Sequence, residues 1–261
     1  MYTKLAVLSA VHGLTTQRGD IYPFFLDRMK YLRAMFGIET LVVGSEGELS
    51  RKLTEDAGCY YFEHRNNPVS GKWNAGMAAL REHEPTHVMI LGSDDFVSDS
   101  LIKGCISEIN RGHDGLLGIT DSYFTTLSDQ AAHFNKCIYW RGYPTGKIIG
   151  SARCIPKEIL DIVDWEPWPI GKNSGLDFRS LDHLRKAGCD LNVKKFNIRE
   201  EGWLHIDIKT RGNISSMSPL VRESEIVDFD SLLRKHLPPV ESDNIIRYKN
   251  RMVKSYNEAR K

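Results

Sequence analysis

An uninterrupted apolar run that ends on two adjacent carboxylates constrains the fold of this chain more than any other feature. The run Val88–Leu91 lies within THVMILGSDD, residues 86–95. A continuous rather than alternating apolar run is typical of a strand buried on both faces. A Gly-Ser turn then brings Asp94 and Asp95 to the carboxyl end of that strand, where open α/β sheets bind ligands. We therefore predict a mostly parallel sheet with acidic residues at its ligand-binding edge, the simpler alternative being a solvated acidic turn.

The first 120 residues alternate between strand and helix patterns. Strands are predicted at Lys4–Ala10, Glu39–Val43, Cys59–Phe62, Thr86–Leu91 and Gly115–Thr120. Helices are predicted through Phe25–Phe36, Leu49–Ala57 and Trp73–Glu84, and after a cap at Ser98. Repeated βα units favour an α/β fold in which helices flank both faces of the sheet.

The pattern becomes irregular beyond Asp121. Further strands are predicted at Lys136–Trp140, Lys147–Ala152, Leu191–Phe196 and Leu204–Ile208, and helices at Pro156–Val163 and Leu176–Gly188. From Arg222 the chain is charged and helical, and Pro238-Pro239 divides this part into two segments. A long irregular stretch inside a compact domain is often functional.

Composition excludes several classes of protein. A hydrophobic content of 41% in 261 residues allows a sizeable core, and 35 basic against 34 acidic residues create no global field for nucleic acid or membrane. The five cysteines are far apart, which favours reduced thiols in a cytoplasmic protein. Leu5–Val11 is a poor signal sequence, and no run approaches the roughly 20 apolar residues of a membrane span.

Three loops should converge at one edge of the predicted sheet, after Ala10, after Val43 and after Leu91. The residues in or near the first two loops that could contact a base, ribose or phosphate are His12, Arg18, Ser45 and Glu46. Neither a GxGxxG fingerprint nor a P-loop signature is present, which argues against a dinucleotide dehydrogenase and a P-loop ATPase.

The segment GKWNAG, residues 71–76, should lie just before the helix that leads to the acidic strand. Lys72 is a compact charge suited to phosphate, and Asn74 can donate to and accept from ribose hydroxyls. The alternative is a surface loop in which Asn74 only caps a helix.

The order of these elements, the K-x-N-x-G segment and the acidic turn ILGSDD resemble glycosyltransferases of the GT-A fold, especially family 2, over roughly residues 3–210. The family usually carries a D-x-D motif, and Gly92 stands here where its first carboxylate would be. The resemblance implies a nucleoside-diphosphate sugar donor, most often a UDP-sugar, and Mn²⁺ or Mg²⁺ bound by Asp95 and Asp94. It also implies a donor-binding half at 1–120, an acceptor half at 121–221 and a C-terminal helical extension at 222–261.

The resemblance continues through KIIGSARCIPKEILD and NSGLDFRSLDHL. Asp177 occupies the place where inverting members keep a catalytic base, with Asp182 in reserve. Leu176 replaces the first acid of the usual acidic pair. Asp177 is equally suited to stabilise a helix N-terminus, so that interpretation stays open.

The segment WLHIDIKT, residues 203–210, supplies the last polar cluster. Many GT-A enzymes complete the metal site with a histidine from this region, which implies His205 as a third ligand; a solvent-facing strand histidine is the alternative. Lys209 and Arg211 could neutralise a diphosphate. The aromatic residues that could stack on a sugar or base, or simply pack in the core, are Trp140, Tyr143, Trp165 and Trp168.

The chain is therefore predicted to be a metal-dependent glycosyltransferase, with a glycan, a lipid-linked saccharide or a modified DNA base as acceptor. The segment Ser242–Lys261 holds six basic and two acidic residues. It could contact a phosphate backbone or an anionic membrane, although such a segment more commonly forms a solvated helix face. One alternative is a sugar-nucleotide nucleotidyltransferase, although VHGLTTQRG lacks the expected glycine run. Another is a non-catalytic glycan- or nucleic-acid-binding protein on the same scaffold.

Overall fold

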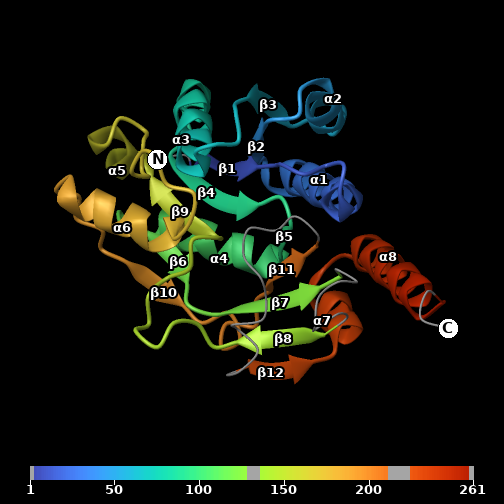
Figure 1. The fold of residues 1–261 in the computed structure, drawn as a ribbon. Coiled ribbons are helices and arrows are strands. Elements are labelled where there is room, and N and C mark those ends of the chain that lie inside the picture. Colours follow the sequence, from blue (N-terminus) through green and yellow to red (C-terminus); the bar gives the residue numbers. More distant parts are fainter. Residues whose placement is uncertain (1–2, 128–135, 211–223, 259–261) are drawn as a thin grey trace.

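The computed structural model describes residues 3–127, 136–210 and 224–258 (Figure 1). The strands are β1 Leu5–Ala10, β2 Glu39–Gly44, β3 Tyr60–Glu63, β4 His87–Gly92, β5 Asp95–Val97, β6 Leu117–Ile119, β7 Ser122–Thr126, β8 Cys137–Trp140, β9 Arg153–Pro156, β10 Lys194–Phe196, β11 His205–Lys209 and β12 Ser224–Val227. The helices are α1 Gln17–Phe36, α2 Glu48–Asp56, α3 Val69–Leu80, η1 Arg81–His83, α4 Asp99–Asn110, α5 Lys157–Ile162, α6 Leu176–Lys186, α7 Phe229–His236 and α8 Pro239–Glu258.

Within the described residues, seven strands form the main sheet in the order β10-β6-β9-β4-β1-β2-β3. The pairs β1–β2, β2–β3, β1–β4 and β6–β10 are parallel, whereas β9 runs antiparallel to both of its neighbours. The predicted mostly parallel α/β sheet is therefore confirmed. The strand that carries the acidic pair lies at its centre.

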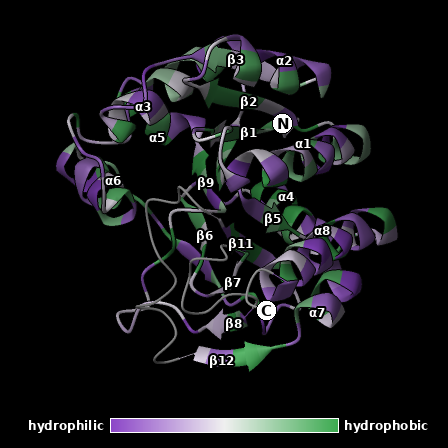
Figure 2. Ribbon diagram, turned by 45° about the vertical axis from the view of Figure 1, so that its right-hand side comes forward, coloured by the Kyte–Doolittle hydropathy of each residue, from purple (hydrophilic) through white to green (hydrophobic). Residues whose placement is uncertain are grey.

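Helices cover both faces of this sheet. On β4, Met89 and Leu91 belong to a core that includes residues of α1 and α4, whereas Val88 and Ile90 belong to a second core with residues of α3, α5 and α6. Figure 2 shows mostly hydrophobic strands beside helices that mix hydrophobic and hydrophilic residues. This double burial explains why the β4 sequence is apolar without alternation.

A second sheet has the order β12-β8-β7-β11-β5 within the described residues. The chain enters it directly from β4, because only Ser93 and Asp94 separate β4 from β5. Helix α8 packs against α1 and α7. The buried Arg28 of α1 fixes this arrangement by pairing with Asp99 at 2.5 Å and Glu241 at 3.4 Å.

Local signals in the sequence set several helix ends. Gly37 ends α1 in the left-handed conformation at φ 68° and donates its N–H to Arg33 O. Ser98 caps α4 by accepting a hydrogen bond from Leu101 N, as predicted.

Three predicted boundaries are wrong. The chain is not helical from the region of Arg222, because Ser224–Val227 form strand β12 and helix α7 begins only at Phe229. Helix α3 begins at Val69, so GKWNAG lies inside the helix rather than before it. Glycine is required at position 76, because a Cβ there would lie 2.1 Å from Val43 Cγ2 and would prevent the helix from approaching the sheet this closely. The predicted strand at Lys147–Ala152 is also absent; the strand in this region is Arg153–Pro156, and Gly150–Ala152 form the bend that precedes it.

All five cysteines lie in the described ranges and are buried free thiols. None of the helices in those ranges is both long and apolar enough to cross a membrane.

Candidate functional site

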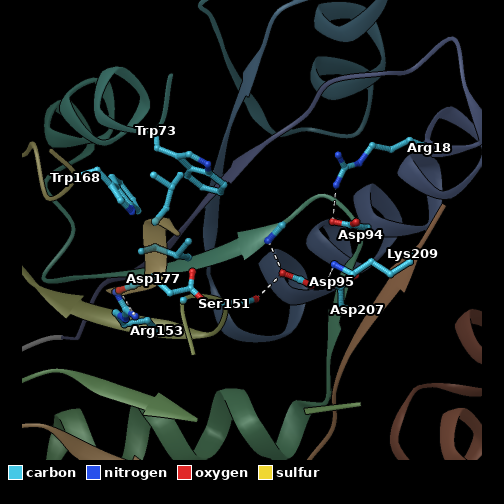
Figure 3. A pocket seen from close by; sticks show the side chains of 14 residues that line it. Arg18, Trp73, Asp94, Asp95, Ser151, Arg153, Trp168, Asp177, Asp207 and Lys209 are labelled. Carbon is cyan, nitrogen blue, oxygen red and sulfur yellow. Dashed lines mark hydrogen bonds and ion pairs between the residues drawn. The ribbon is translucent and has the colours of Figure 1, made fainter. Parts of the chain in front are cut away.

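A cavity of about 220 Å³ opens at the carboxyl end of β4 (Figure 3). The charged residues that line it are Arg18, Asp94, Asp95, Arg153, Asp177, Asp207 and Lys209. Trp73, Ile90, Trp168 and Leu176 supply its apolar wall, and Gly92, Gly150 and Ser151 complete it. The cavity therefore combines a carboxylate-rich end with an aromatic wall.

Three carboxylates meet where the chain passes from one sheet to the other. Asp94 and Asp95 occupy the junction between β4 and β5, and Asp207 pairs directly opposite Asp95 in the antiparallel β5–β11 ladder. One carboxylate oxygen from each residue lies within 4.8 Å of the other two. Oxygen donors of this kind suit hard divalent cations such as Mg²⁺ and Mn²⁺.

The glycine at position 92 makes room for this cluster. A Cβ there would lie 2.8 Å from both Asp94 Oδ1 and Asp95 Oδ2. The Gly92 N–H also donates to Asp95 Oδ2 at 2.6 Å. Steric crowding therefore explains why position 92 is glycine: a side chain would occupy the space of the two carboxylates.

Burial perturbs the protonation of the acidic cluster. Burial, together with the charge of Asp94, raises the pKa of Asp95 to about 6. Burial also raises the pKa of Asp207 to about 8, with Lys209 opposing the shift and the two other carboxylates adding to it. Asp207 Oδ1 is buried and has no hydrogen-bond partner. A divalent cation fits this cluster, because it would coordinate the oxygen that lacks a hydrogen bond and would offset the repulsion among the carboxylates.

Two cations flank the cluster. Arg18 Nη2 lies 2.7 Å from Asp94 Oδ1, and Lys209 Nζ donates to Asp207 Oδ2. Burial lowers the pKa of Lys209, but the charges of the carboxylates outweigh it and the net shift is upward. Both side chains are therefore cationic at neutral pH and are placed to bind an anion beside the acids.

His205 lies behind the carboxylates. Its Nε2 is 3.9 Å from Asp95 Oδ1 and 2.7 Å from Ser151 Oγ, and its Nδ1 is 2.6 Å from Ser122 Oγ. Ser151 in turn donates to Asp95 Oδ2. Burial lowers the pKa of His205 to about 4, so the ring is neutral. The structure thus brings His205 next to the acids, with both ring nitrogens engaged by serine hydroxyls; a role as metal ligand stays a prediction.

Asp177 lies in the first turn of α6 and lines the cavity. No hydrogen bond or ion pair joins its carboxylate to any of the described residues, so the carboxylate is available to a ligand in the cavity. Gly150 packs against it so closely that a Cβ there would lie 2.0 Å from Asp177 Oδ1. The reserve candidate Asp182 lies on the same helix but is largely exposed and pairs with Arg185 at 3.3 Å.

An aromatic wall faces the acids. The Trp73 and Trp168 rings are 5.6 Å apart between centroids, and Figure 3 shows both on the side of the cavity away from Arg18 and Lys209. Asn74 fixes this wall, because its amide donates to Trp168 O at 2.8 Å and accepts from Trp168 N at 3.1 Å. Both polar atoms of Asn74 are therefore used within the protein, whereas its predicted contact with ribose is untested.

The remaining predicted donor contacts form a second polar cluster at the ends of β1 and β2. Lys72 Nζ donates to Val11 O and to Ser45 Oγ, and His12 Nδ1 lies 3.1 Å from the same hydroxyl. Glu46 accepts from Leu14 N at 3.1 Å. Burial lowers the pKa of Lys72 to about 8, and the Arg18 charge contributes to that shift. The predicted convergence of the first two loops is thus observed.

The predicted aromatic residues have mixed positions. Trp168 lines the cavity, whereas Trp165 is fully buried and its indole donates to Asp161 at 2.8 Å. Trp140 contacts Tyr143, which stacks edge-on with Phe178. Arg211 lies outside the described residues.

Four cavity residues escaped the sequence analysis, namely Trp73, Ser151, Arg153 and Asp207. Asp207 had a usable signal, because alternate residues of a strand share one face and Asp207 therefore points the same way as His205 and Lys209. The others depend on long-range packing that no local pattern reveals.

No family model and no curated protein sequence matches this chain. Solved structures do match its fold. A nucleotide-diphospho-sugar transferase from Desulfovibrio desulfuricans G20 aligns with a TM-score of 0.50 and 12% identity over 98% of this chain and 99% of that one. S. aureus TarS 1-349 in complex with UDP-GlcNAc aligns with a TM-score of 0.51 and 14% identity over 97% of this chain and 71% of that one. In the alignment with another structure of TarS 1-349, the present chain spans 58% of the length of the TarS chain.

A 4-diphosphocytidyl-2C-methyl-D-erythritol synthase from Anaerococcus prevotii also aligns, with a TM-score of 0.50 and 12% identity over 75% of this chain and 87% of that one. At such identities the likeness is one of fold. The chain therefore shares the GT-A-like α/β fold of these structures.

Proposed function

We propose that this protein is a metal-dependent glycosyltransferase that moves a sugar from a nucleoside-diphosphate sugar to an acceptor hydroxyl with inversion. The observation that carries the proposal is the cavity itself. It holds three clustered carboxylates flanked by two cations at one end and the free carboxylate of Asp177 at the other. A UDP-sugar is favoured as donor because a protein of this fold binds UDP-GlcNAc.

Asp94, Asp95 and Asp207 would hold Mn²⁺ or Mg²⁺, and the bound cation would neutralise charge on the diphosphate leaving group. Arg18 and Lys209 would attract the negative charge of the diphosphate from beside the carboxylates. His205 and Ser151 hold the Asp95 carboxylate in place through their hydrogen bonds. The polar cluster of His12, Ser45, Glu46 and Lys72 extends this end of the site toward the nucleoside.

Asp177 acts as the general base. It takes the proton of the acceptor hydroxyl while the hydroxyl oxygen forms a bond to the anomeric carbon. The bond between that carbon and the diphosphate oxygen breaks, and its electron pair leaves with the nucleoside diphosphate. Attack from the face opposite the leaving group inverts the anomeric centre. The Trp73–Trp168 wall provides an apolar surface for a sugar ring and reduces the access of water.

The test is a panel of nucleotide sugars, UDP and CTP, each with Mn²⁺, measured by thermal shift and by slow donor hydrolysis. We expect one UDP-sugar to stabilise the protein, by about 2.7 kcal/mol at a concentration of 100 Kd. Asp207→Asn should abolish the Mn²⁺-dependent part of this effect, because it replaces one of the three carboxylates of the cluster with a neutral amide that a cation cannot deprotonate. Asp182→Asn is the matched control, since Asp182 is exposed and lies outside the cavity.

Stabilisation by CTP without any response to UDP-sugars would instead identify a nucleotidyltransferase. Equal Mn²⁺ responses of Asp207→Asn and wild type would contradict the assignment of the metal site.

A further inference from the structure

Arg153 is a buried cation whose hydrogen-bonding capacity is largely unused. The residue begins β9, is 0% exposed and lines the cavity. Its Nη2 donates to the backbone oxygen of Asp177 at 3.1 Å, and this is its only hydrogen bond with the described residues. The Nε atom is buried without a partner. A guanidinium has five N–H donors, and a buried one normally satisfies most of them.

Arg153 remains charged in spite of its burial. Burial lowers its pKa to about 10, while the negative charge of Asp177 opposes the shift. The two side chains form no direct ion pair, because the guanidinium bonds the backbone of Asp177 rather than its carboxylate. The cavity therefore faces a cation and a carboxylate that are neighbours but do not neutralise each other by contact (Figure 3).

The adjacent end of α6 adds a second group of unused donors. This helix has 11 residues, and Gly175 at its N-cap provides no side-chain hydrogen bond to the first turn. The free N–H groups and the helix dipole favour an anion at such a terminus. The uncapped terminus and the guanidinium, whose Nε has no partner, lie side by side, because Arg153 Nη2 donates to the backbone oxygen of Asp177, the second residue of α6.

We propose that Arg153 and the N-terminus of α6 form an oxyanion subsite for the acceptor, which carries a phosphate or carboxylate close to its reacting hydroxyl. This inference rests on the proposed transferase function. The acidic group of the acceptor occupies the fork of Arg153, and the hydroxyl faces the carboxylate of Asp177. The diphosphate of the donor binds separately, at the Arg18 and Lys209 end of the cavity. The subsite therefore orients the acceptor and selects anionic over neutral acceptors.

Three hexoses that differ in one substituent test this selection: glucose 6-phosphate, glucuronate and glucose. Their binding is measured by calorimetry and by the fluorescence of the cavity tryptophans, with saturating UDP and Mn²⁺ present. We expect the two anionic sugars to bind at least roughly tenfold more tightly than glucose, since hydrogen bonds to charged groups contribute that much or more.

Arg153→Gln should remove the preference for the anionic sugars, and Arg153→Lys should retain part of it because lysine keeps the charge without the fork. Arg185→Gln is the matched control: it removes a positive charge from the exposed side of α6 and should keep the full preference. A purely structural Arg153 would change the binding of all three sugars equally. The melting temperature of each variant is recorded, and Arg153→Lys provides the comparison if Arg153→Gln does not fold.

Equal affinities of wild type for the three sugars would overturn the proposal, and so would an unchanged preference in Arg153→Gln. Loss of the preference on adding UDP and Mn²⁺ would also overturn it, because the anion would then share the diphosphate site. Absence of UDP binding would refute the transferase function separately, since the preference of the protein for anionic hexoses can also be measured without nucleotide.

Discussion

Gly150→Ala is a sharp test of Asp177 as the catalytic base, because it perturbs the carboxylate without changing it. The new methyl group would lie 2.0 Å from Asp177 Oδ1 and 2.6 Å from its Cγ. The carboxylate must therefore move by about 1 Å or more to reach a normal contact. A displacement of that size costs about 10²-fold in rate, or about 2.7 kcal/mol in activation free energy. We expect kcat to fall by about this factor while donor binding at the acidic end of the cavity is preserved, because Ser151 Oγ can keep its hydrogen bond to Asp95.

The assay is hydrolysis or transfer of the UDP-sugar identified in the binding panel. Gly71→Ala is the control, because its Cβ would lie 3.4 Å from Pro68 Cγ, an ordinary contact, and alanine within α3 should stabilise by about 0.5–1 kcal/mol. Gly150→Ala is also combined with Asp177→Asn, in which no base remains to be displaced. A rate loss that is the same in both backgrounds would refute the reasoning, since two changes acting through one group should not be additive.

Three further predictions concern other parts of the structure. Gly92→Asp restores the acidic pattern of the D-x-D motif but should weaken Mn²⁺ binding in calorimetry, because its Cβ would lie 2.8 Å from two carboxylate oxygens; tighter binding would contradict the steric explanation. Arg28→Met should lower the free energy of unfolding in urea by about 3 kcal/mol, because it leaves the carboxylates of Asp99 and Glu241 without their buried cation. Lys52→Met, at an exposed ion pair, should leave the free energy of unfolding nearly unchanged. Burial lowers the pKa of Lys72 to about 8, so between about pH 8 and 10.5 the unfolded state binds more protons than the folded state, and the free energy of unfolding should rise with pH. The rise should be about 3 kcal/mol at most and smaller in Lys72→Met. Identical pH profiles of the two proteins would exclude Lys72 as its source.

The architecture of the main sheet could be predicted because its signals are local. The apolar run of β4 predicts a buried strand, and the glycine after α1 predicts a helix end, each from a few neighbouring residues. The strand at Arg153–Pro156 was misplaced because the apolar residues before it pack in an irregular segment that imitates a strand. The start of α3 was missed because two glycines and a lysine suggest a loop, whereas close packing on the sheet requires the glycine at position 76.

The candidate site was predictable only in part for a related reason. Asp94 and Asp95 follow directly from the strand that carries them, and Asp177 follows from the resemblance. The alternation of His205, Asp207 and Lys209 shows that Asp207 shares a strand face with them, but its position opposite Asp95 depends on strand pairing across more than one hundred residues, which no local pattern reveals. Arg153 resembles any arginine at the start of a strand, since only its burial and its unused donors reveal a possible function.

The acidic cluster spans the junction of the two sheets, and this gives a bound cation a mechanical role. Asp95 begins β5 and lies opposite Asp207 of β11 in the second sheet, whereas Asp94 lies in the turn that joins β5 to β4 of the main sheet. A cation held by all three would hold the turn after β4 against the β5–β11 pair, at the point where the chain passes from the main sheet into the second one. Metal affinity would then depend on the pairing of β11 with β5. Amide hydrogen exchange in β5 and β11 should accordingly slow when Mn²⁺ is added, well beyond the residues that touch it.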